Sequence, residues 1–293
     1  MNKTGYFLLY NTLWLIALLP YKVLYVLSDL LYLLIYRLLA YRKKVVRANL
    51  QRSFPEKSHG ELRIIEKQFY HNLADIIVET IKLLNVSQEA IKERFTYQNR
   101  EVIEALEREN KTIFVAFGHC SNWEMMGHAI SFEFQTPFIA LYKKLSSPTF
   151  DQLMKDIRSR WGKVGLFESQ SAYRQLMAIR SQPHIVYLLG DQTPPGLESD
   201  YWTDFLHQDT PFFNGLEKMA RSFGHAVVYF ESERIARGRY LLNAILITGD
   251  GKKNATNEIT ERYVRLLEKT IQTHPDNWLW SHRRWKHQRP KTA

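Results

Sequence analysis

The segment from Gly118 to Glu124 combines residue types that can carry out acid–base chemistry. It reads Gly-His-Cys-Ser-Asn-Trp-Glu, so His119 precedes Glu124 by five positions. On one regular helix these side chains would point about 140° apart, but a loop before a first helical turn can bring them together. A carboxylate on the imidazole Nδ1 fixes the tautomer and leaves the other nitrogen to take a proton from a hydroxyl. We predict that His119 is a general base oriented by Glu124.

Other readings of the same segment are open. Ser121-x-x-Glu124 has the spacing of a capping box, in which Glu124 would bond the backbone of Ser121 and have a purely structural role. Cys120 could act as a nucleophile, although adjacent side chains in a turning segment usually diverge. A serine hydrolase of the nucleophile-elbow type is excluded, because the chain contains no Gly-x-Ser-x-Gly motif.

The sequence gives no indication of a metal site, and we predict none. It contains no His-Glu-x-x-His motif, and its scattered histidines, such as His282 and His287, are expected at the surface. Cys120 is the only cysteine, which rules out an intramolecular disulfide and makes a thiolate zinc site very unfavourable.

Strand-like and helix-like segments alternate through the body of the chain. Short apolar or β-branched runs predict strands at 112–117, 137–142, 184–189, 225–230 and 240–247. Apolar residues at helical spacing predict helices at 61–84, 125–132, 149–161, 172–180, 216–223 and 259–271. This alternation predicts the α/β class, with a central, mostly parallel sheet flanked by helices.

In such sheets the functional residues gather beyond the carboxyl ends of the strands. We place three stretches there: 118–124, 190–196 and 205–215. The second stretch begins Gly190-Asp191-Gln192. We expect Asp191 and Gln192 to shape the site by hydrogen bonding, although a simple turn would explain them equally well.

The composition excludes a disordered chain and argues against a nucleic-acid-binding protein. The 293 residues are 45% hydrophobic and 13% aromatic, which is enough for a large core. The net charge of +10 lies at the two ends of the chain, whereas nucleic-acid binders more often carry a basic stripe across the folded body. Basic ends suit an anionic membrane surface or an acidic partner protein better.

The first part of the chain has the character of a membrane anchor. Residues 7–19 and 21–39 are mostly apolar, Pro20 separates them, and tyrosines are frequent in both. Neither run is a clean span of about 20 apolar residues, so we expect two short helices embedded in one leaflet, or one imperfect span. A pair of buried core helices is the alternative. The basic cluster of Arg42, Lys43, Lys44 and Arg47 follows and places this end in the cytoplasm. We divide the chain into membrane-anchoring helices at 1–45 and an α/β domain at 46–293.

Several motifs, in this order, resemble those of a known family. The His-x4-Glu motif after a buried strand is similar to the H-x4-D/E motif of the glycerolipid and lysophospholipid acyltransferases. The whole chain more closely resembles the late acyltransferases of lipid A biosynthesis, the lauroyl and myristoyl transferases of Gram-negative inner membranes. The motifs that carry this resemblance are RANLQRSFPE at 47–56, GHCSNWE, Arg158–Gly162, Gly190-Asp191-Gln192, GLEKMAR at 215–221 and WLWSHRRWK at 278–286. Departures at Asp204–His207 and in the stretch 193–196 bear on the acyl chain and the acceptor more than on the reaction.

The resemblance implies an O-acyltransferase that moves a fatty acyl chain from an acyl carrier protein thioester to a hydroxyl of a lipid A precursor. It implies no cofactor and places the enzyme at the inner membrane, with the catalytic domain on the cytoplasmic face. His119 and Glu124 would be catalytic, and Arg158 would stabilise the oxyanion or bind a lipid phosphate. The basic ends would face anionic lipid and the acidic carrier protein, with Arg283 and Arg284 in an interfacial patch or stacked on tryptophan for stability.

Two alternatives use the same fold. One is an O-acyltransferase acting on a lysophospholipid or an amino-acid lipid, which only product analysis can separate from the first. The other is a membrane-bound lipid-binding protein without turnover, in which substitution of His119 would have no effect. The sequence does not indicate the length of the acyl chain.

Overall fold

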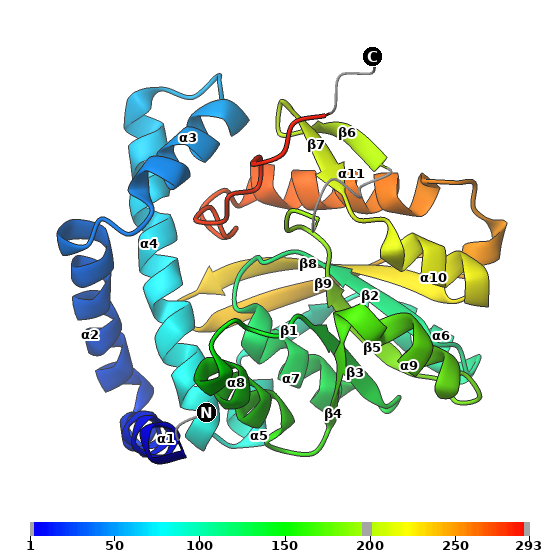
Figure 1. Ribbon diagram of the computed structural model, residues 1–293, viewed down its shortest axis with the longest axis horizontal. Coiled ribbons are helices and arrows are strands. Elements are labelled where there is room, and N and C mark those ends of the chain that lie inside the picture. Colours follow the sequence, from blue (N-terminus) through cyan, green and yellow to red (C-terminus); the bar gives the residue numbers. More distant parts are fainter. Residues whose placement is uncertain (1–2, 195–200, 290–293) are drawn as a thin grey trace.

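The computed structural model describes residues 3–194 and 201–289, and the expected stretch 190–196 therefore lies partly outside the described residues. Figure 1 shows a central sheet with helices on both faces, α11 (Glu258–Thr273) above it and α7 (Trp123–Glu133) below it in that view. The sheet has the strand order β1-β9-β8-β2-β5-β3-β4. All neighbouring strands in it are parallel except β8 and β9. The predicted class, α/β with a mostly parallel sheet, is confirmed.

The strands of this sheet are β1 (Phe95–Gln98), β2 (Ile113–Phe117), β3 (Phe138–Tyr142), β4 (Val164–Glu168), β5 (Ile185–Leu189), β8 (Ala226–Ala236) and β9 (Arg239–Thr248). The other helices are α3 (Lys43–Ser53), α4 (His59–Lys82), α5 (Gln88–Lys92), α6 (Glu101–Arg108), α8 (Pro148–Ser159), α9 (Ala172–Ala178) and α10 (Gly215–Phe223). The five strands and six helices expected from periodicity all form. Periodicity missed β1 and β4, which are short and only partly buried.

Local signals explain where the elements begin and end. Ser58 and Glu61 form a reciprocal capping box at the start of α4. Gly224, with φ of 73°, ends α10 in the left-handed conformation that glycine adopts without steric cost. β2 is buried along its whole length, as a central strand covered on both faces must be.

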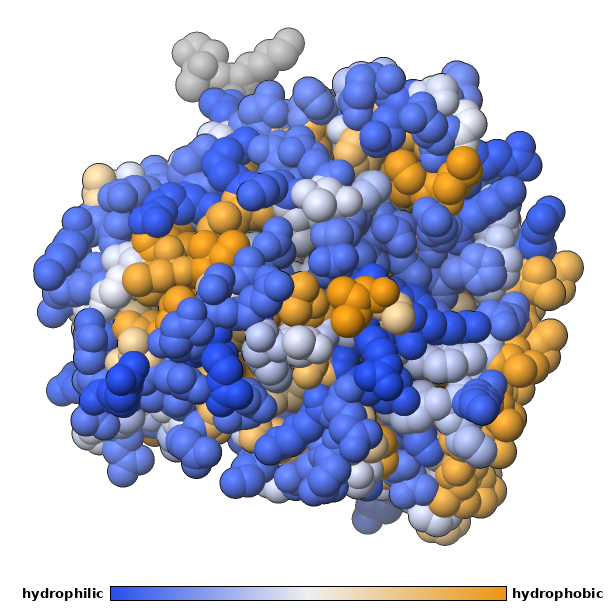
Figure 2. Space-filling model, turned by 180° about the vertical axis from the view of Figure 1, so that it is seen from behind, coloured by the Kyte–Doolittle hydropathy of each residue, from blue (hydrophilic) through white to orange (hydrophobic). Residues whose placement is uncertain are grey.

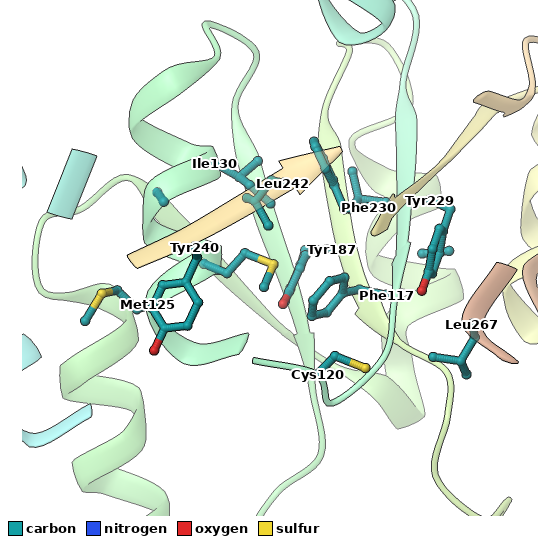
Figure 3. Close-up of a cluster of buried hydrophobic side chains, with 14 of the residues drawn as sticks. Phe117, Cys120, Met125, Ile130, Tyr187, Tyr229, Phe230, Tyr240, Leu242 and Leu267 are labelled. Atoms are coloured by element: carbon teal, nitrogen blue, oxygen red, sulfur yellow. The ribbon is translucent and has the colours of Figure 1, made fainter. Parts of the chain in front are cut away.

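The core lies against the middle of the sheet. Figure 3 shows Phe117, Tyr187, Tyr229 and Phe230 on three adjacent strands, with Tyr229 on the side of Leu267 of α11 and Phe230 on the other side. Because Phe117 and Leu189 end their strands side by side, this core fixes the start of the two loops that follow.

One expected site segment has a different position. Residues 205–215 were expected beyond the end of a strand of the main sheet, and this prediction is wrong. They form the turn and second strand of a separate hairpin, β6 (Tyr201–Phe205) with β7 (Gln208–Phe212), and the start of α10. Phe205 and Phe212 of this hairpin are fully buried, and Phe205 packs against Trp278. The hairpin therefore supports the C-terminal segment.

The N-terminal helix pair consists of α1 (Lys3–Ala17) and, after the Pro20 break, α2 (Tyr21–Tyr32) with the π-helix η1 (Leu33–Leu38). Among the described residues no single helix is long and apolar enough to cross a bilayer. The two members of the pair meet that test together but are bent by 119° at the break. Their outer side chains, including Leu8, Leu15, Val26 and Leu30, are more than half exposed. In Figure 2 they form the apolar strip along the right edge.

Candidate active site

His119 and Asp191 meet because their strands are neighbours. β2 and β5 are parallel and end in register at Phe117 and Leu189, and each is followed by a glycine and then by one of these two residues. Asp191 Oδ1 lies 2.6 Å from His119 Nδ1. The backbone N–H of His119 also donates to Asp191 Oδ2, at 2.9 Å.

Asp191 is held as a buried anion. Only 2% of its surface is exposed. Burial raises the pKa of Asp191, but the charge of His119 and the hydrogen bonds from His119 and Trp278 outweigh it and lower the pKa to about 2. An ionised Asp191 accepts the Nδ1–H of His119, which leaves Nε2 with a lone pair. This is the tautomer that a general base needs.

The Nε2 side of His119 faces the polar group of Gln192. The amide Nε2 of Gln192 donates to His119 Nε2 at 3.1 Å. The Trp123 ring stands edge-on to the imidazole, with the ring centroids 5.1 Å apart.

Glu124 is not the partner of His119, which corrects our expectation. Its carboxylate accepts two hydrogen bonds from Arg158 of α8, from Nε at 2.8 Å and from Nη2 at 2.6 Å. Burial raises the pKa of Glu124, but the charge and hydrogen bonds of Arg158, with a smaller effect of His119, lower it overall. Glu124 is in the first turn of α7 and binds Arg158 of α8, whereas Asp191 reaches Nδ1 from the end of the neighbouring strand β5.

The alternative capping box at Ser121 is also absent. Asn122 caps α7 instead, since its Oδ1 accepts from the backbone N–H of Met125 at 3.0 Å. Ser121 takes a left-handed φ of 52°, and its backbone N–H donates to the carbonyl of Asn277. Cys120 is buried, which raises the pKa of its thiol well above the usual value and disfavours a nucleophilic thiolate.

The C-terminal segment supplies the part of the site that sequence reasoning missed. Trp278 Nε1 donates to Asp191 Oδ2 at 2.8 Å, and the backbone N–H of Leu279 donates to the carbonyl of His119 at 3.1 Å. Thr193 N–H donates to His282 Nε2 at 3.1 Å. His282 and His287, which we expected at the surface, are both half-buried, and burial lowers the pKa of His282 to about 4.

Arg283 and Arg284, which we expected together in an interfacial patch, lie in different environments. Arg283 is exposed, but Arg284 is completely buried and donates to the carbonyl of Pro211 at 2.6 Å. Its guanidinium lies 4.4 Å from the centre of the Phe212 ring. Arg284 therefore joins the C-terminal segment to the β6–β7 hairpin rather than facing a membrane.

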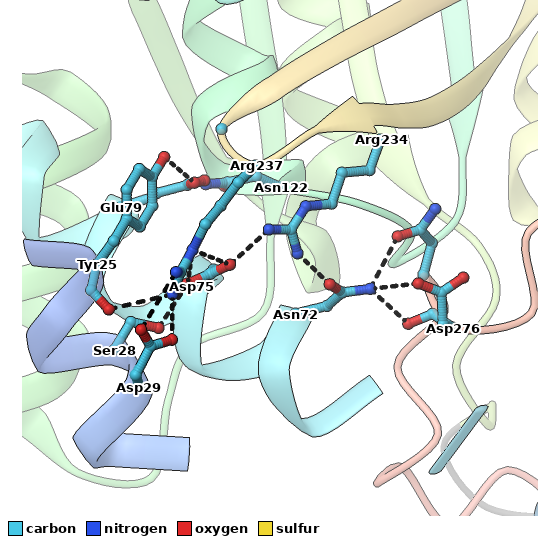
Figure 4. Close-up of polar contacts among 12 residues, drawn as sticks. Tyr25, Ser28, Asp29, Asn72, Asp75, Glu79, Asn122, Arg234, Arg237 and Asp276 are labelled. Atoms are coloured by element: carbon cyan, nitrogen blue, oxygen red, sulfur yellow. Dashed lines mark hydrogen bonds and ion pairs between the residues drawn. The ribbon is translucent and has the colours of Figure 1, made fainter. Parts of the chain in front are cut away.

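A buried polar network connects the N-terminal helix pair to the site (Figure 4). Glu79 of α4 is fully buried; its Oε1 accepts from Tyr25 of α2 and its Oε2 accepts from Asn122, the cap of α7, and from Tyr240. Burial raises the pKa of Glu79. Beside it, Asp75 binds Arg234 and Arg237, and Arg237 also binds Asp29 of α2 at 2.6 Å. Within the described residues no cluster of three or more His, Cys, Asp or Glu side chains could hold a metal ion.

Comparison with known proteins identifies the family. A family model described as bacterial lipid A biosynthesis acyltransferase matches residues 1–287. The chain belongs to this family. It is an acyltransferase of lipid A biosynthesis, and such an enzyme uses an acyl donor and a lipid A precursor.

Curated relatives are distant but match along nearly the whole length. The acyltransferase is 23% identical over 284 residues to the lipid A biosynthesis palmitoleoyltransferase of Escherichia coli (strain K12). It is 25% identical over 280 residues to the lipid A biosynthesis lauroyltransferase of the same organism. Each match covers 94% of this chain and 89% of the relative.

Proposed function

We propose that this acyltransferase moves a fatty acyl chain from an acyl carrier protein thioester to a hydroxyl of a lipid A precursor, with His119 as the general base. The single observation that carries the proposal is the His119–Asp191 pair at the ends of two adjacent strands, with Nε2 turned to the polar group of Gln192. A base of this kind contributes about 10²–10⁴-fold to the rate of acyl transfer.

In this proposal the proton transfers run through His119. The acceptor hydroxyl oxygen attacks the thioester carbonyl carbon while its proton passes to His119 Nε2. The tetrahedral oxyanion then collapses, the carbon–sulfur bond breaks, and the thiolate takes the proton from His119. Asp191 stabilises the imidazolium between these steps, and Gln192 orients the hydroxyl that displaces it from Nε2.

In this proposal the Glu124–Arg158 pair stabilises the oxyanion that forms on the thioester. Arg158 holds Glu124 with its Nε and Nη2 groups, so we assign Nη1 to the thioester oxyanion. Glu124 acts as the positioning residue for this guanidinium. Desolvation lowers the pKa of Arg158, but the charge and hydrogen bonds of Glu124 outweigh this effect and raise the pKa overall. The guanidinium therefore stays charged.

The remaining expectations on location and partners follow from charge. The exposed basic residues near both chain ends would face anionic lipid and an acidic acyl carrier protein. With the apolar N-terminal helix pair, this favours the cytoplasmic face of the inner membrane. The division into 1–45 and 46–293 stays a prediction.

The test is a transfer assay with the full chain in detergent. Acyl carrier protein loaded with mixed C12–C16 chains is the donor, a tetra-acylated lipid A precursor is the acceptor, and mass spectrometry reads the product. We expect the mass of one acyl group to be added to the acceptor. Transfer to a lysophospholipid or an amino-acid lipid, but not to the precursor, would contradict the proposed acceptor.

A further inference from the structure

A groove opens between the N-terminal helix pair and the site. Its volume is about 450 Å³. Its lining residues come from the helix pair and the turn after it, from α4, and from the loops that hold the site: Ile35, Tyr41, Arg42, Leu73, Ile77, Gln192, Leu279, Ser281 and His282. The lining surface is mainly apolar, and Arg42 is the one guanidinium among the described lining residues.

The inner end of the groove reaches the general base. Gln192 lines the groove and lies 3.1 Å from His119 Nε2. Leu279, also in the lining, is hydrogen-bonded through its backbone N–H to the carbonyl of His119. A molecule in the groove would therefore end beside the nitrogen that we assign as the base.

The outer wall of the groove continues into the apolar surface of the N-terminal helix pair. Ile35 belongs to the π-helix η1, and Leu38 and Leu39, three and four positions further along the chain, are 78% and 65% exposed. A π-helical segment is rare and often marks a functional site. Such a wall gives an apolar chain a continuous path from a membrane to the site.

The turn after η1 has a strained backbone, and it places the charged side chain of Arg42 in the lining of the groove. Ala40 and Arg42 both take left-handed backbone conformations, with φ of 47° and 51°, which are strained for residues other than glycine. Arg42 Nη1 donates to the carbonyl of Ser281 at 3.0 Å, which holds the side chain over the lining. A guanidinium has five N–H donors, so one such bond leaves capacity for an anion.

Two neighbouring cationic side chains of the basic cluster, Arg47 and Lys43, make contacts elsewhere. Arg47 binds the buried Glu66 at 2.9 Å, and Lys43 lies 3.8 Å from the centre of the Tyr36 ring. Arg42 is thus the member of this cluster that lines the groove.

We infer that this groove binds the lipid acceptor, with one acyl chain along Ile35, Leu73 and Ile77 and an acidic phosphate of the headgroup on Arg42. This inference rests on the proposed function. The combination of apolar lining, a single cation and an opening beside the apolar helix pair fits an anionic amphiphile that arrives from a membrane. The thioester donor, carried by a water-soluble protein, approaches His119 from outside the groove.

The first experiment fills the groove with a larger side chain. Ile77→Trp is compared with Ile64→Trp, which lies on the same helix, is 57% exposed and is absent from the lining. We expect Ile77→Trp to raise the KM for the tetra-acylated precursor about tenfold, as blocked apolar burial predicts, without changing the KM for the acyl donor. Ile64→Trp should change neither. A rise in the donor KM instead, or unchanged values in both variants, would overturn the inference.

The second experiment tests the phosphate contact. Arg42→Gln is compared with Arg63→Gln, an exposed arginine of α4 outside the lining. We expect Arg42→Gln to raise the KM for the phosphorylated precursor about tenfold, and to leave the KM for a dephosphorylated precursor unchanged. An equal effect on both acceptors, or an equal effect of Arg63→Gln, would contradict the role of Arg42.

A binding measurement separates this inference from the proposed function. A precursor with a diazirine in one acyl chain is photo-crosslinked to the wild-type chain in the absence of donor, and peptides are mapped by mass spectrometry. We expect labels on the α4 and η1 peptides that line the groove, competed by unlabelled precursor. If the wild type transfers acyl chains but the labels lie elsewhere, the groove assignment alone fails. If the labels lie in the groove but nothing is transferred, the proposed function alone fails.

Discussion

The Glu124–Arg158 pair lies mostly out of solvent, with side chains 12% and 25% exposed, and it stabilises the fold only while both partners are present. Breaking a fully buried pair costs about 3–5 kcal/mol, and the partial exposure of this one places it at the lower end of that range. We expect Glu124→Ala to lower the free energy of unfolding by about 3 kcal/mol, and Glu124→Ala with Arg158→Ala to cost less than the sum of the two single changes. Chemical denaturation of the four proteins measures this.

The exposed Arg100–Glu104 pair is the matched control. It has the same charges, but both side chains are more than 40% exposed. Glu104→Ala should cost about 0.5 kcal/mol or less. An equal cost for Glu104→Ala and Glu124→Ala would show that burial does not determine the strength of the Glu124 pair.

A buried histidine makes the stability depend on pH. His128 packs against Phe132 and Trp161, and burial lowers its pKa to about 4, although the charge of Glu124 opposes this. In the unfolded chain the imidazole takes a proton near pH 6.5, so between pH 6.5 and 4 the unfolded state binds more protons than the folded state. The free energy of unfolding therefore falls as the pH falls through this window.

His128→Leu should remove this contribution. Between pH 6.5 and 4.5 we expect the loss of stability to be smaller by about 2 kcal/mol in His128→Leu than in the wild type. Denaturation at a series of pH values measures the difference. Parallel curves for the two proteins would mean that His128 does not stay neutral in the fold.

The sequence could place His119 at a strand end but could not give the residue that contacts its Nδ1. The apolar run 112–117 and the residue types after it were enough to predict His119 at a strand end. The choice between Glu124 and Asp191 as the residue on Nδ1 depends on which strand lies beside β2, and a single sequence does not give the strand order. Asp191 was singled out for the right place in the fold, after 184–189, but with a less specific role.

At the scale of elements, α7 is held at its start by one residue with two functions. Asn122 Oδ1 caps the helix, and its Nδ2 donates to the buried Glu79 at 2.8 Å. Asn122→Ala removes both contacts. We expect it to lower the free energy of unfolding by about 2–3 kcal/mol, since a lost cap costs about 1 kcal/mol and a buried carboxylate loses a donor.

Ser87→Ala isolates the capping contribution. Ser87 caps α5 by accepting from the backbone N–H of Ala90, in an exposed position. Its loss should cost about 1 kcal/mol. Equal costs for the two variants would show that the Asn122–Glu79 hydrogen bond does not contribute to stability.

The periodicity of apolar residues predicted the long helices and strands. It did not indicate which elements far apart in the sequence contact one another. The C-terminal segment lies against the site because Trp278 donates to Asp191, 87 positions away in the sequence. Its tryptophans indicated burial or an interface, but nothing in their spacing indicates which strand end they cover. The stretch 205–215 was misplaced for the same reason, because its partner β6 has a mixed rather than an apolar pattern.

At the scale of the whole molecule, the N-terminal helix pair is joined to the body by charge and hydrogen bonds while its outer face is apolar. Lys82 of α4 donates to the carbonyls of Ala17 and Leu19, and Arg237 binds Asp29. These contacts fix the pair to α4 and to the β8–β9 turn. The exposed side chains of α2 are therefore available for a membrane.

Two glutamates on this face should prevent membrane binding. Val26 and Leu30 are 59% and 58% exposed. We expect Val26→Glu with Leu30→Glu to reduce binding to anionic vesicles at least about tenfold in flotation assays, because burial of each apolar side chain contributes about 1.5–3 kcal/mol.

The matched control places the same charges elsewhere. Ile235 and Leu246 are also exposed apolar residues, on the β8–β9 pair. Ile235→Glu with Leu246→Glu should leave vesicle binding unchanged. The opposite result would place the membrane contact on the β8–β9 pair and not on the N-terminal helix pair.

The central claim is that His119, held by Asp191, is the base of acyl transfer, and single-turnover kinetics test it most directly. Transfer from acyl-loaded carrier protein to the tetra-acylated precursor is followed with the wild type, His119→Ala and Asp191→Asn, each checked for fold and for binding of the precursor. We predict rates lower by at least about 10³-fold in both variants, with precursor binding retained. Transfer at the wild-type rate by folded His119→Ala would contradict the account.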